Sequence, residues 1–262
     1  MMQYKEYEGK DLKGMVLRME RSSVYDGDGF RTVVFLKGCP LRCQWCSTPE
    51  SQSFDIEKTD QNVYGTEMTV EEVLKEVRKD STFYFHSGGG MTVSGGEVLA
   101  QPEFSRCLLQ RARWEGIDTA IETSFFARWE KIEPILAHTD TAFIDLKFVD
   151  GPSHKKYCGA DNSLILENMR KANDMKADFR MIIRIPLIPG VNDSEEELRR
   201  MGAFCRTLTK MEYLEVLPYH KLGTSTYEKL NRPYLLKGTE PPSAEHMEWA
   251  KGILKEYVER IK

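Results

Sequence analysis

Runs of β-branched and apolar residues alternate along the chain with segments whose apolar positions repeat at helical spacing. The first apolar run, residues 31–37, lies between Gly29 and a Gly-Cys-Pro turn, a context that predicts a buried strand. Residues 69–78 begin with a threonine and have a glutamate three positions later, the pattern of a capping box, which predicts a helix. The same alternation predicts further strands at residues 91–94, 118–123, 141–147, 179–187 and 213–218. It predicts further helices at residues 102–114, 129–136, 164–176, 194–207 and 243–261.

Six strands that alternate with helices indicate an α/β fold with a parallel sheet built from right-handed βαβ units. Six units are too few to close the eight-stranded TIM barrel, so we expect an incomplete (β/α)6 partial TIM barrel that is open on one side. We see no internal repeat and no flexible linker, so residues 1–262 are expected to form a single domain. Polar residues recur where the predicted strands end, at the rim where barrels of this class carry their active sites.

Composition narrows the functional classes. Hydrophobic residues make up 40% of the chain and charged residues 30%, which is ordinary for a globular protein with a sizeable core. The formal net charge is −4 and no long basic run is present, which argues against nucleic acid as a partner. The first residues lack the apolar segment of a signal peptide, and no stretch approaches the roughly eighteen apolar residues of a membrane span. We therefore expect a cytoplasmic monomer with no membrane partner.

Three of the six cysteines lie within one loop, residues 38–50, in the spacing C-x3-C-x2-C. Cys39, Cys43 and Cys46 supply three thiolates to one metal centre and leave a fourth coordination position without a cysteine. Structural zinc sites and the usual iron–sulfur electron carriers have four protein ligands, whereas a cubane cluster held by three thiolates keeps one iron open to a small molecule. A zinc knuckle completed by a histidine is the alternative, but no histidine lies near this loop. The other cysteines are scattered and are expected to be free thiols: Cys107, Cys158 and Cys205.

The cysteine spacing is similar to that of the radical S-adenosylmethionine (SAM) superfamily, in which SAM binds the open iron through its amino and carboxylate groups. Other segments resemble one branch of that superfamily, the activating enzymes of glycyl radical enzymes. These segments are residues 26–31 (Asp-Gly-Asp-Gly-Phe-Arg), 94–97 (Ser-Gly-Gly-Glu), 145–147 (Asp-Leu-Lys), and 217–220 (Leu-Pro-Tyr-His) with Gly223. The resemblance runs from about residue 23 to the last predicted helix and is greatest to the short activating enzymes of pyruvate formate-lyase.

This resemblance implies a radical SAM activase with a role in anaerobic metabolism. Cys39, Cys43 and Cys46 would ligate a [4Fe–4S] cluster that reductively cleaves SAM. The resulting 5′-deoxyadenosyl radical would abstract hydrogen from a backbone glycine of a partner, pyruvate formate-lyase or a relative. Residues 47–52 resemble the longer activases that carry an inserted ferredoxin domain, yet no cysteine lies between Cys46 and Thr69. One cluster is therefore expected, and its electron is expected from an external flavodoxin or ferredoxin.

The resemblance also assigns the polar residues at the strand ends to SAM. Gly95, Gly96 and Glu97 receive the SAM amino group, although the two glycines alone would also suit a tight turn. An aromatic residue before the third cysteine resembles the one that shields the cluster beside the adenine, and an ordinary loop aromatic is the alternative. A histidine after the sixth strand matches the family histidine near the adenosine, and a core histidine is the alternative. The residues assigned to this end of SAM are Trp45, Ser47 and His220.

Charged residues that interrupt apolar strands are a second group. Asp145 and Lys147 alternate with apolar residues and so share one face of their strand. Two charges on an inward face must pair with each other or with a ligand, and the resemblance assigns them to the ribose and methionine parts of SAM. Arg184 interrupts its strand in the same way and is expected to bind a carboxylate. Glu122 and Thr123 are similar to an acid and a threonine that hold a monovalent cation; a solvated or salt-bridged pair is the alternative.

The partner's glycine has to reach the adenosyl 5′ carbon, so its loop is expected to enter the open side of the barrel. Asp26, Gly27 and Gly29 in the signature turn are candidates for binding that loop, and Asp28 stands where the family signature has proline. A radical SAM enzyme that acts on a small molecule is one alternative, and a non-catalytic iron–sulfur protein is another. The remaining histidines lack a functional context and are expected at the surface: His86, His138, His154 and His246.

Overall fold

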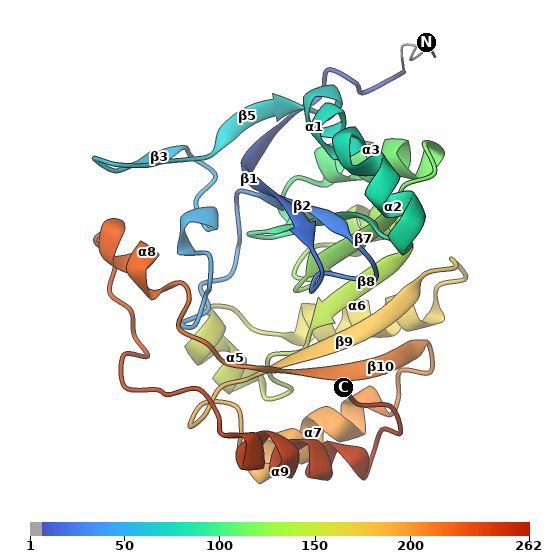
Figure 1. The fold of residues 1–262 in the computed structure, drawn as a ribbon. Coiled ribbons are helices and arrows are strands. Elements are labelled where there is room, and N and C mark those ends of the chain that lie inside the picture. Colours follow the sequence, from blue (N-terminus) through green and yellow to red (C-terminus); the bar gives the residue numbers. More distant parts are fainter. Residues whose placement is uncertain (1–6) are drawn as a thin grey trace.

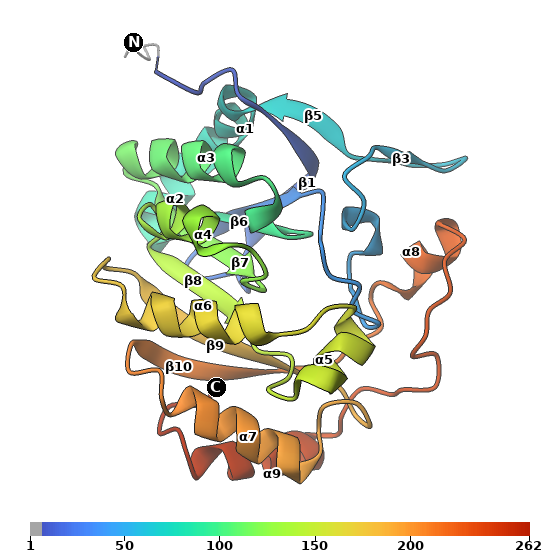
Figure 2. The ribbon, with the colours of Figure 1, turned by 180° about the vertical axis from the view of Figure 1, so that it is seen from behind.

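A curved sheet of eight strands, with helices on its outer face, forms the frame of the molecule in a computed structural model that describes residues 7–262 (Figures 1 and 2). The strand order is β10-β9-β8-β7-β6-β2-β1-β5, and neighbours from β10 to β2 are parallel. These six strands are β2 (Arg31–Leu36), β6 (Gly90–Gly95), β7 (Asp118–Thr123), β8 (Thr141–Asp145), β9 (Arg180–Leu187) and β10 (Met211–Pro218). The predicted α/β fold, an incomplete (β/α)6 barrel, is thereby confirmed.

Two antiparallel strands that the sequence pattern did not predict extend this sheet. β1 (Lys13–Ser23) pairs with β2, and β5 (Thr66–Thr69) pairs with the first residues of β1. The pairing of β1 with β2 shifts register between Val16 and Arg18 and again between Glu20 and Ser23. These irregularities and the charged residues of β1 hide its alternation. A separate short hairpin consists of β3 (Glu57–Lys58) and β4 (Val63–Tyr64).

Helices α3 (Pro102–Trp114) and α4 (Trp129–Leu136) have the predicted bounds. The capping box of α1 (Val70–Val77) is present, since Thr69 N donates to the Glu72 carboxylate at 2.7 Å and Glu72 N donates to Thr69 Oγ1 at 3.2 Å. α6 (Ser163–Asp174) and α7 (Glu195–Cys205) lie within one or two residues of their predicted positions. The unpredicted helices are α2 (Ser81–Ser87), α5 (Gly151–Cys158) and α8 (Thr224–Lys229), with the 3-10 turns η1 (Pro49–Ser51), η2 (Arg78–Asp80) and η3 (Val98–Ala100).

The last predicted helix is shorter than expected. α9 (Ala244–Lys255) ends well before residue 261, and the chain then returns to the sheet, where Ile261 forms a parallel bridge with Leu214 of β10. The apolar pattern after Lys255 therefore belongs to a segment that covers the outer edge of the sheet. No helix among residues 7–262 combines the length and hydrophobicity that a membrane crossing requires.

Alternate residues of the parallel strands face either the helices or the interior of the barrel. The outward residues, such as Val93, Ile121, Ile144 and Ile183, are fully buried in the main core against the helices. The inward residues Ala120, Phe143, Ile182 and Tyr213 form a small apolar group of their own. Two positions further along each of those strands, the inward residue is polar: Glu122, Asp145, Arg184 and Glu215. Because side chains alternate between the two faces of a strand, these charged side chains line one end of the barrel interior.

Candidate active site

A cavity of about 480 Å³ lies where the parallel strands end at their carboxyl side. This volume is within the range of small-molecule and cofactor sites. Most of the residues singled out in the sequence line it: Asp26, Cys39, Cys43, Trp45, Cys46, Ser47, Gly95, Gly96, Glu97, Glu122, Thr123, Asp145, Lys147, Arg184 and His220. Gly27 and Gly29 do not belong to this lining. The structure therefore brings together side chains that are far apart in the sequence.

Three cysteine thiols face this cavity. Cys39, Cys43 and Cys46 are partly buried, and none of them forms a disulfide. Burial raises the pKa of the Cys46 thiol to about 11 and also raises the pKa of Cys39, while a hydrogen bond with Cys158, together with burial, raises the pKa of Cys43. Three buried thiolates need positive charge beside them. Outside this loop, the free thiols expected at positions 107, 158 and 205 are confirmed, and all three are buried.

The donor set fits an iron–sulfur cluster better than a single zinc ion. Within residues 7–262, no three His, Cys, Asp or Glu side chains converge closely enough to hold one metal ion, as a closed zinc site requires. A cubane cluster places each thiolate on a different iron and so spaces the thiolates apart. The three thiols therefore suit a cluster, and His220, which also lines the cavity, is too exposed to complete a closed site.

Backbone contacts from three distant segments hold the cysteine loop. On one side, Glu97 N donates to Gly38 O at 2.9 Å, next to the end of β6. On another side, the last turn of α5 accepts two hydrogen bonds from the loop, Arg42 N to Cys158 O at 2.8 Å and Gln44 N to Tyr157 O at 3.0 Å. Gly223 closes a third side, where a Cβ atom would come within 2.7 Å of Ser47 O and 2.9 Å of Cys46 O.

Helix α5 was missed in the sequence, although a signal for its start is present. The Asp150 side chain accepts a hydrogen bond from Ser153 N at 2.9 Å, an N-cap, and a proline follows in the first turn. His154 of this helix is buried, so the expectation that it lies at the surface is wrong. Its Nδ1 lies 2.6 Å from Ala160 O, and its ring meets the Phe148 ring edge-on with 6.4 Å between the ring centroids.

Gly95 and Gly96 each have a packing reason to be glycine. Gly95 has φ +115°, and a Cβ there would lie 2.2 Å from Leu36 N. A Cβ on Gly96 would lie 2.5 Å from Gly38 O and 2.7 Å from Ser51 O. The tight-turn interpretation therefore holds for both glycines, and both also line the cavity.

Glu97 is a buried carboxylate with neutral partners. It accepts hydrogen bonds from Thr123 Oγ1 at 2.5 Å, Ser124 N at 2.9 Å and Leu99 N at 3.2 Å, and also from the Ser124 hydroxyl. Among the described residues, no lysine, arginine or histidine forms an ion pair with it. A buried carboxylate that lines a cavity and lacks a cationic partner is suited to receive the ammonium group of a ligand.

Asp145 and Lys147 form an ion pair at the cavity wall. Lys147 Nζ donates to Asp145 Oδ2 at 2.6 Å, and the lysine side chain is only 8% exposed. Burial disfavours the ammonium form, but the Asp145 carboxylate, together with Cys43 and Cys158, outweighs burial and raises the pKa of Lys147. β8 ends at Asp145, so the lysine lies two residues beyond the strand while both side chains still face the cavity.

Arg184 lies between two carboxylates inside the barrel. Its Nε donates to Glu215 Oε2 at 2.7 Å, its Nη1 contacts Glu122, and its Cζ lies 3.8 Å from the centroid of the Phe143 ring. Burial raises the pKa of Glu122, although Arg184 opposes this shift. Glu122 therefore forms the salt bridge that was the alternative to a cation site, and its carboxylate also accepts a hydrogen bond from Ser94 Oγ at 2.6 Å. Glu215 was missed, although it is a charged residue within an apolar strand, the same signal that identified Arg184.

The two rings expected beside the adenosine differ in their surroundings. His220 is exposed at the cavity rim, so the core-histidine alternative is wrong. The Trp45 ring lies 6.3 Å from the Phe148 ring and packs on a buried group that includes Tyr219 and Tyr227.

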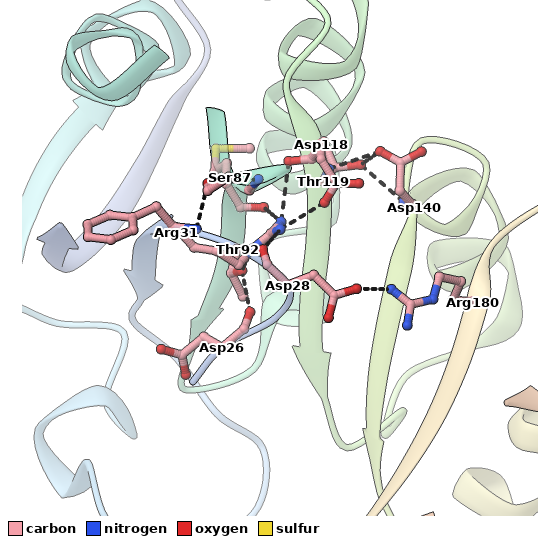
Figure 3. Close-up of polar contacts among 12 residues, drawn as sticks. Asp26, Asp28, Arg31, Ser87, Thr92, Asp118, Thr119, Asp140 and Arg180 are labelled. Carbon is pink, nitrogen blue, oxygen red and sulfur yellow. Dashed lines mark hydrogen bonds and ion pairs between the residues drawn. The ribbon is translucent and has the colours of Figure 1, made fainter. Parts of the chain in front are cut away.

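The signature segment, residues 26–31, is anchored by Arg31, which is 1% exposed (Figure 3). Its guanidinium donates to Thr92 Oγ1 at 2.7 Å and to Met91 O at 2.9 Å, and it pairs with Asp118 at 2.8 Å. Close packing leaves no room for a side chain at the two glycines of this turn. A Cβ on Gly27 would press on the Arg31 side chain at 2.7 Å, and a Cβ on Gly29 would lie 2.4 Å from Gly89 N. Of the three residues predicted to bind a partner, only Asp26 reaches the cavity.

Comparisons with known proteins cover most of the chain. The family described as Radical SAM superfamily matches residues 33–202. The isethionate sulfite-lyase activating enzyme of Oleidesulfovibrio alaskensis is 37% identical over 86% of this chain and 90% of that protein. The pyruvate formate-lyase-activating enzyme of Clostridium pasteurianum is 35% identical over 94% of this chain and 99% of that protein. A solved domain of pyruvate-formate lyase-activating enzyme from Bacteroides vulgatus is 33% identical, has a TM-score of 0.56, and covers 67% of this chain and 98% of that one.

Proposed function

Because the chain belongs to the radical SAM superfamily and, within it, to the activating enzymes of glycyl radical enzymes, we propose that Cys39, Cys43 and Cys46 ligate its cluster. When bound, a [4Fe–4S] cluster supplies the electron that cleaves SAM to methionine and a 5′-deoxyadenosyl radical, which takes hydrogen from a glycine Cα of the partner. The chain's own residues bind SAM, orient it and exclude water around it. One observation carries this assignment: three free thiols share a single cavity with an unpaired acid and a buried ion pair.

In the proposed complex, Glu97 accepts the SAM ammonium, and the backbone of Gly95 and Gly96 lies along the methionine part. Asp145 and Lys147 bind the ribose and the methionine part, since both are charged, inward and adjacent. Arg184 contributes positive charge for the SAM carboxylate, while Glu122 and Thr123 are proposed for a monovalent cation beside it. The residues proposed for the adenosine are Trp45, Ser47 and His220.

We also propose that the chain acts as one domain with one cluster and takes its electron from an external flavodoxin or ferredoxin. After Cys46 the next cysteine is Cys107, and it lies in α3, away from the cysteine loop. The alignment with the Oleidesulfovibrio alaskensis enzyme spans 279 positions, more than the 262 residues of this chain. That relative therefore has residues without a counterpart here, as expected if this chain lacks an insert.

The proposed partner is pyruvate formate-lyase or a relative in the glycyl radical class. Relatives named for isethionate sulfite-lyase, pyruvate formate-lyase and trans-4-hydroxy-L-proline dehydratase are 37%, 35% and 32% identical to this chain. These identities are too close to select one partner. Asp26 is proposed to contact the partner's polypeptide, because it belongs to the signature segment and also lines the cavity.

The direct test is radical formation on a partner protein. The anaerobically reconstituted protein, reduced with dithionite and supplied with SAM, is incubated with pyruvate formate-lyase, isethionate sulfite-lyase or hydroxyproline dehydratase, and each mixture is examined by electron paramagnetic resonance. We expect a glycine-centred radical on at least one of them, and none with the Cys43→Ala variant. SAM cleavage that occurs without a radical on any of these proteins, and that is coupled instead to turnover of a small molecule, would contradict the proposal.

A further inference from the structure

Residues 24–30, which we call the strap, extend from the amino-terminal ends of the parallel strands, where Asp28 pairs with Arg180, to the cavity that Asp26 lines. They connect β1 to Arg31, the first residue of β2, and they also reach β9. The Asp28 carboxylate pairs with Arg180, the first residue of β9 (Figure 3), and Tyr25 O accepts a hydrogen bond from Arg184 Nη2 at 3.4 Å. β6, β7 and β8 separate β2 from β9 in the sheet, so the strap spans the width of the barrel.

The contacts that the strap makes with β2 and β6 differ in burial from the ion pair that it makes with β9. On the β2 side, buried Arg31 donates to Asp28 O at 3.1 Å and pairs with Asp118, while Thr92 Oγ1 donates to Asp26 O at 2.7 Å. On the β9 side, the Asp28 and Arg180 side chains are 66% and 39% exposed. Ion pairs of such exposure are weak and are screened by salt. Buried side chains thus hold the backbone of Asp26 and Asp28, whereas the contact of the Asp28 side chain with β9 is exposed and labile.

Asp28 is the residue by which this chain departs from the signature described above, where proline occupies the position. Proline restricts the backbone through its ring but has no charge with which to reach β9. Arg180 is held in place for Asp28 by Glu212 of β10, whose carboxylate accepts from Arg180 Nε at 2.6 Å. The charged side chain at position 28 thus links the strap to the far side of the barrel.

We infer that Asp28 and Arg180 are positioning residues whose ion pair holds the strap across the barrel and sets Asp26 for the partner's polypeptide. Asp26 belongs to the strap and lines the cavity, two residues from the ion pair. This inference rests on the proposed function for the identity of the partner. The inference concerns binding of the partner protein and not binding of SAM, because neither Asp28 nor Arg180 lines the cavity.

The first experiment needs neither partner nor turnover. Tyr25 is 87% exposed within the strap and Phe85 is 86% exposed on α2, so Tyr25 offers chymotrypsin an exposed site in the strap and Phe85 serves as an internal reference. Cleavage of a folded segment follows the population of its opened form. In the reconstituted protein, we expect cleavage after Tyr25 to rise about two- to fivefold in Asp28→Asn and in Arg180→Gln. Cleavage after Phe85 should stay constant, and Asp28→Glu should retain the slow rate.

The second experiment measures activation of whichever glycyl radical enzyme the unaltered protein activates. We expect Asp28→Asn and Arg180→Gln to raise the KM for that protein about two- to fivefold, with kcat and dithionite-driven SAM cleavage unchanged. The double variant should match either single variant, because both remove one interaction. As a control, Glu167→Gln, which removes an ion pair of similar exposure with Lys171 on α6, should leave the KM unchanged.

Either experiment can overturn the inference. Equal cleavage after Tyr25 in all variants would show that the ion pair does not hold the strap. Faster cleavage with an unchanged KM would show that the strap does not position Asp26 for the partner. If the unaltered protein places no radical on any of the proteins tested, the proposed function fails, whereas the proteolysis result still decides whether the ion pair holds the strap.

Discussion

Replacing Lys147 with methionine tests whether the buried ion pair at the cavity wall binds SAM. The substitution keeps the volume of the side chain, which is 8% exposed, and removes its positive charge from Asp145, 2.6 Å away. The variant loses one buried charge-assisted hydrogen bond to the ligand, and Asp145 is left without its cationic partner. Such a loss costs about 1–3 kcal/mol, which corresponds to a Kd for SAM raised roughly 5- to 150-fold.

The assay is equilibrium binding of SAM to anaerobically reconstituted protein, with the cluster monitored by its visible absorption. The cluster should assemble normally in Lys147→Met, since the lysine is not one of the three thiol ligands. Lys171→Met is a matched control, because Lys171 also forms a lysine–carboxylate pair, but on the outer surface of α6. A normal SAM affinity in Lys147→Met would refute the assignment of this ion pair to SAM, and so would failure of the cluster to assemble.

Three further predictions test other parts of the site. Reconstitution should load about four iron atoms per chain, and eight or more would contradict a single cluster. The visible absorption of the cluster should be lost in Cys43→Ala and retained in Cys205→Ala. Asp26→Ala should bind and cleave SAM normally but form less radical on the partner, and a parallel loss of SAM cleavage would place Asp26 in the cofactor site instead. Burial, above all, lowers the pKa of His154, whose Nε2 has no hydrogen-bond partner among residues 7–262. The unfolded chain therefore binds the proton more readily, and stability present above about pH 6.5 is lost as the pH falls below that value. The free energy of unfolding should decrease by up to about 1.4 kcal/mol per pH unit from this group, as measured by urea titration between pH 7 and 5, and an unchanged slope in His154→Gln would show that another group is responsible.

The parallel strands could be predicted because burial on both faces leaves short, nearly continuous apolar runs in the sequence. The same property exposed the inward charges, since Asp145 and Arg184 stand out within such runs. β1 could not be found in this way, because its register shifts and its charged residues interrupt the alternation that marks a half-buried strand. Its place in the sheet depends on pairing with β2, which is a tertiary contact.

The contacts that shape the site were less predictable than its members. Glu97, Gly95 and Gly96 were identified by resemblance, but the packing of Gly95 on Leu36 of β2 and of Gly96 on Gly38 of the cysteine loop required coordinates. His154 was expected at the surface, because its burial depends on Ala160 O after the end of α5 and on the Phe148 ring. A single sequence shows which residues carry charge, and the folded chain decides which of them meet.

The three-sided enclosure of the cysteine loop has a consequence for biosynthesis. Its walls come from the end of β6, from the last turn of α5 and from Gly223, so they emerge from the ribosome in that order. A nascent chain that has not yet reached Gly223 leaves the thiols of the loop open on one side, within reach of oxidants and of competing metal ions. A chain that ends before Gly223 can therefore contain all three cysteines and still lack one wall of their enclosure.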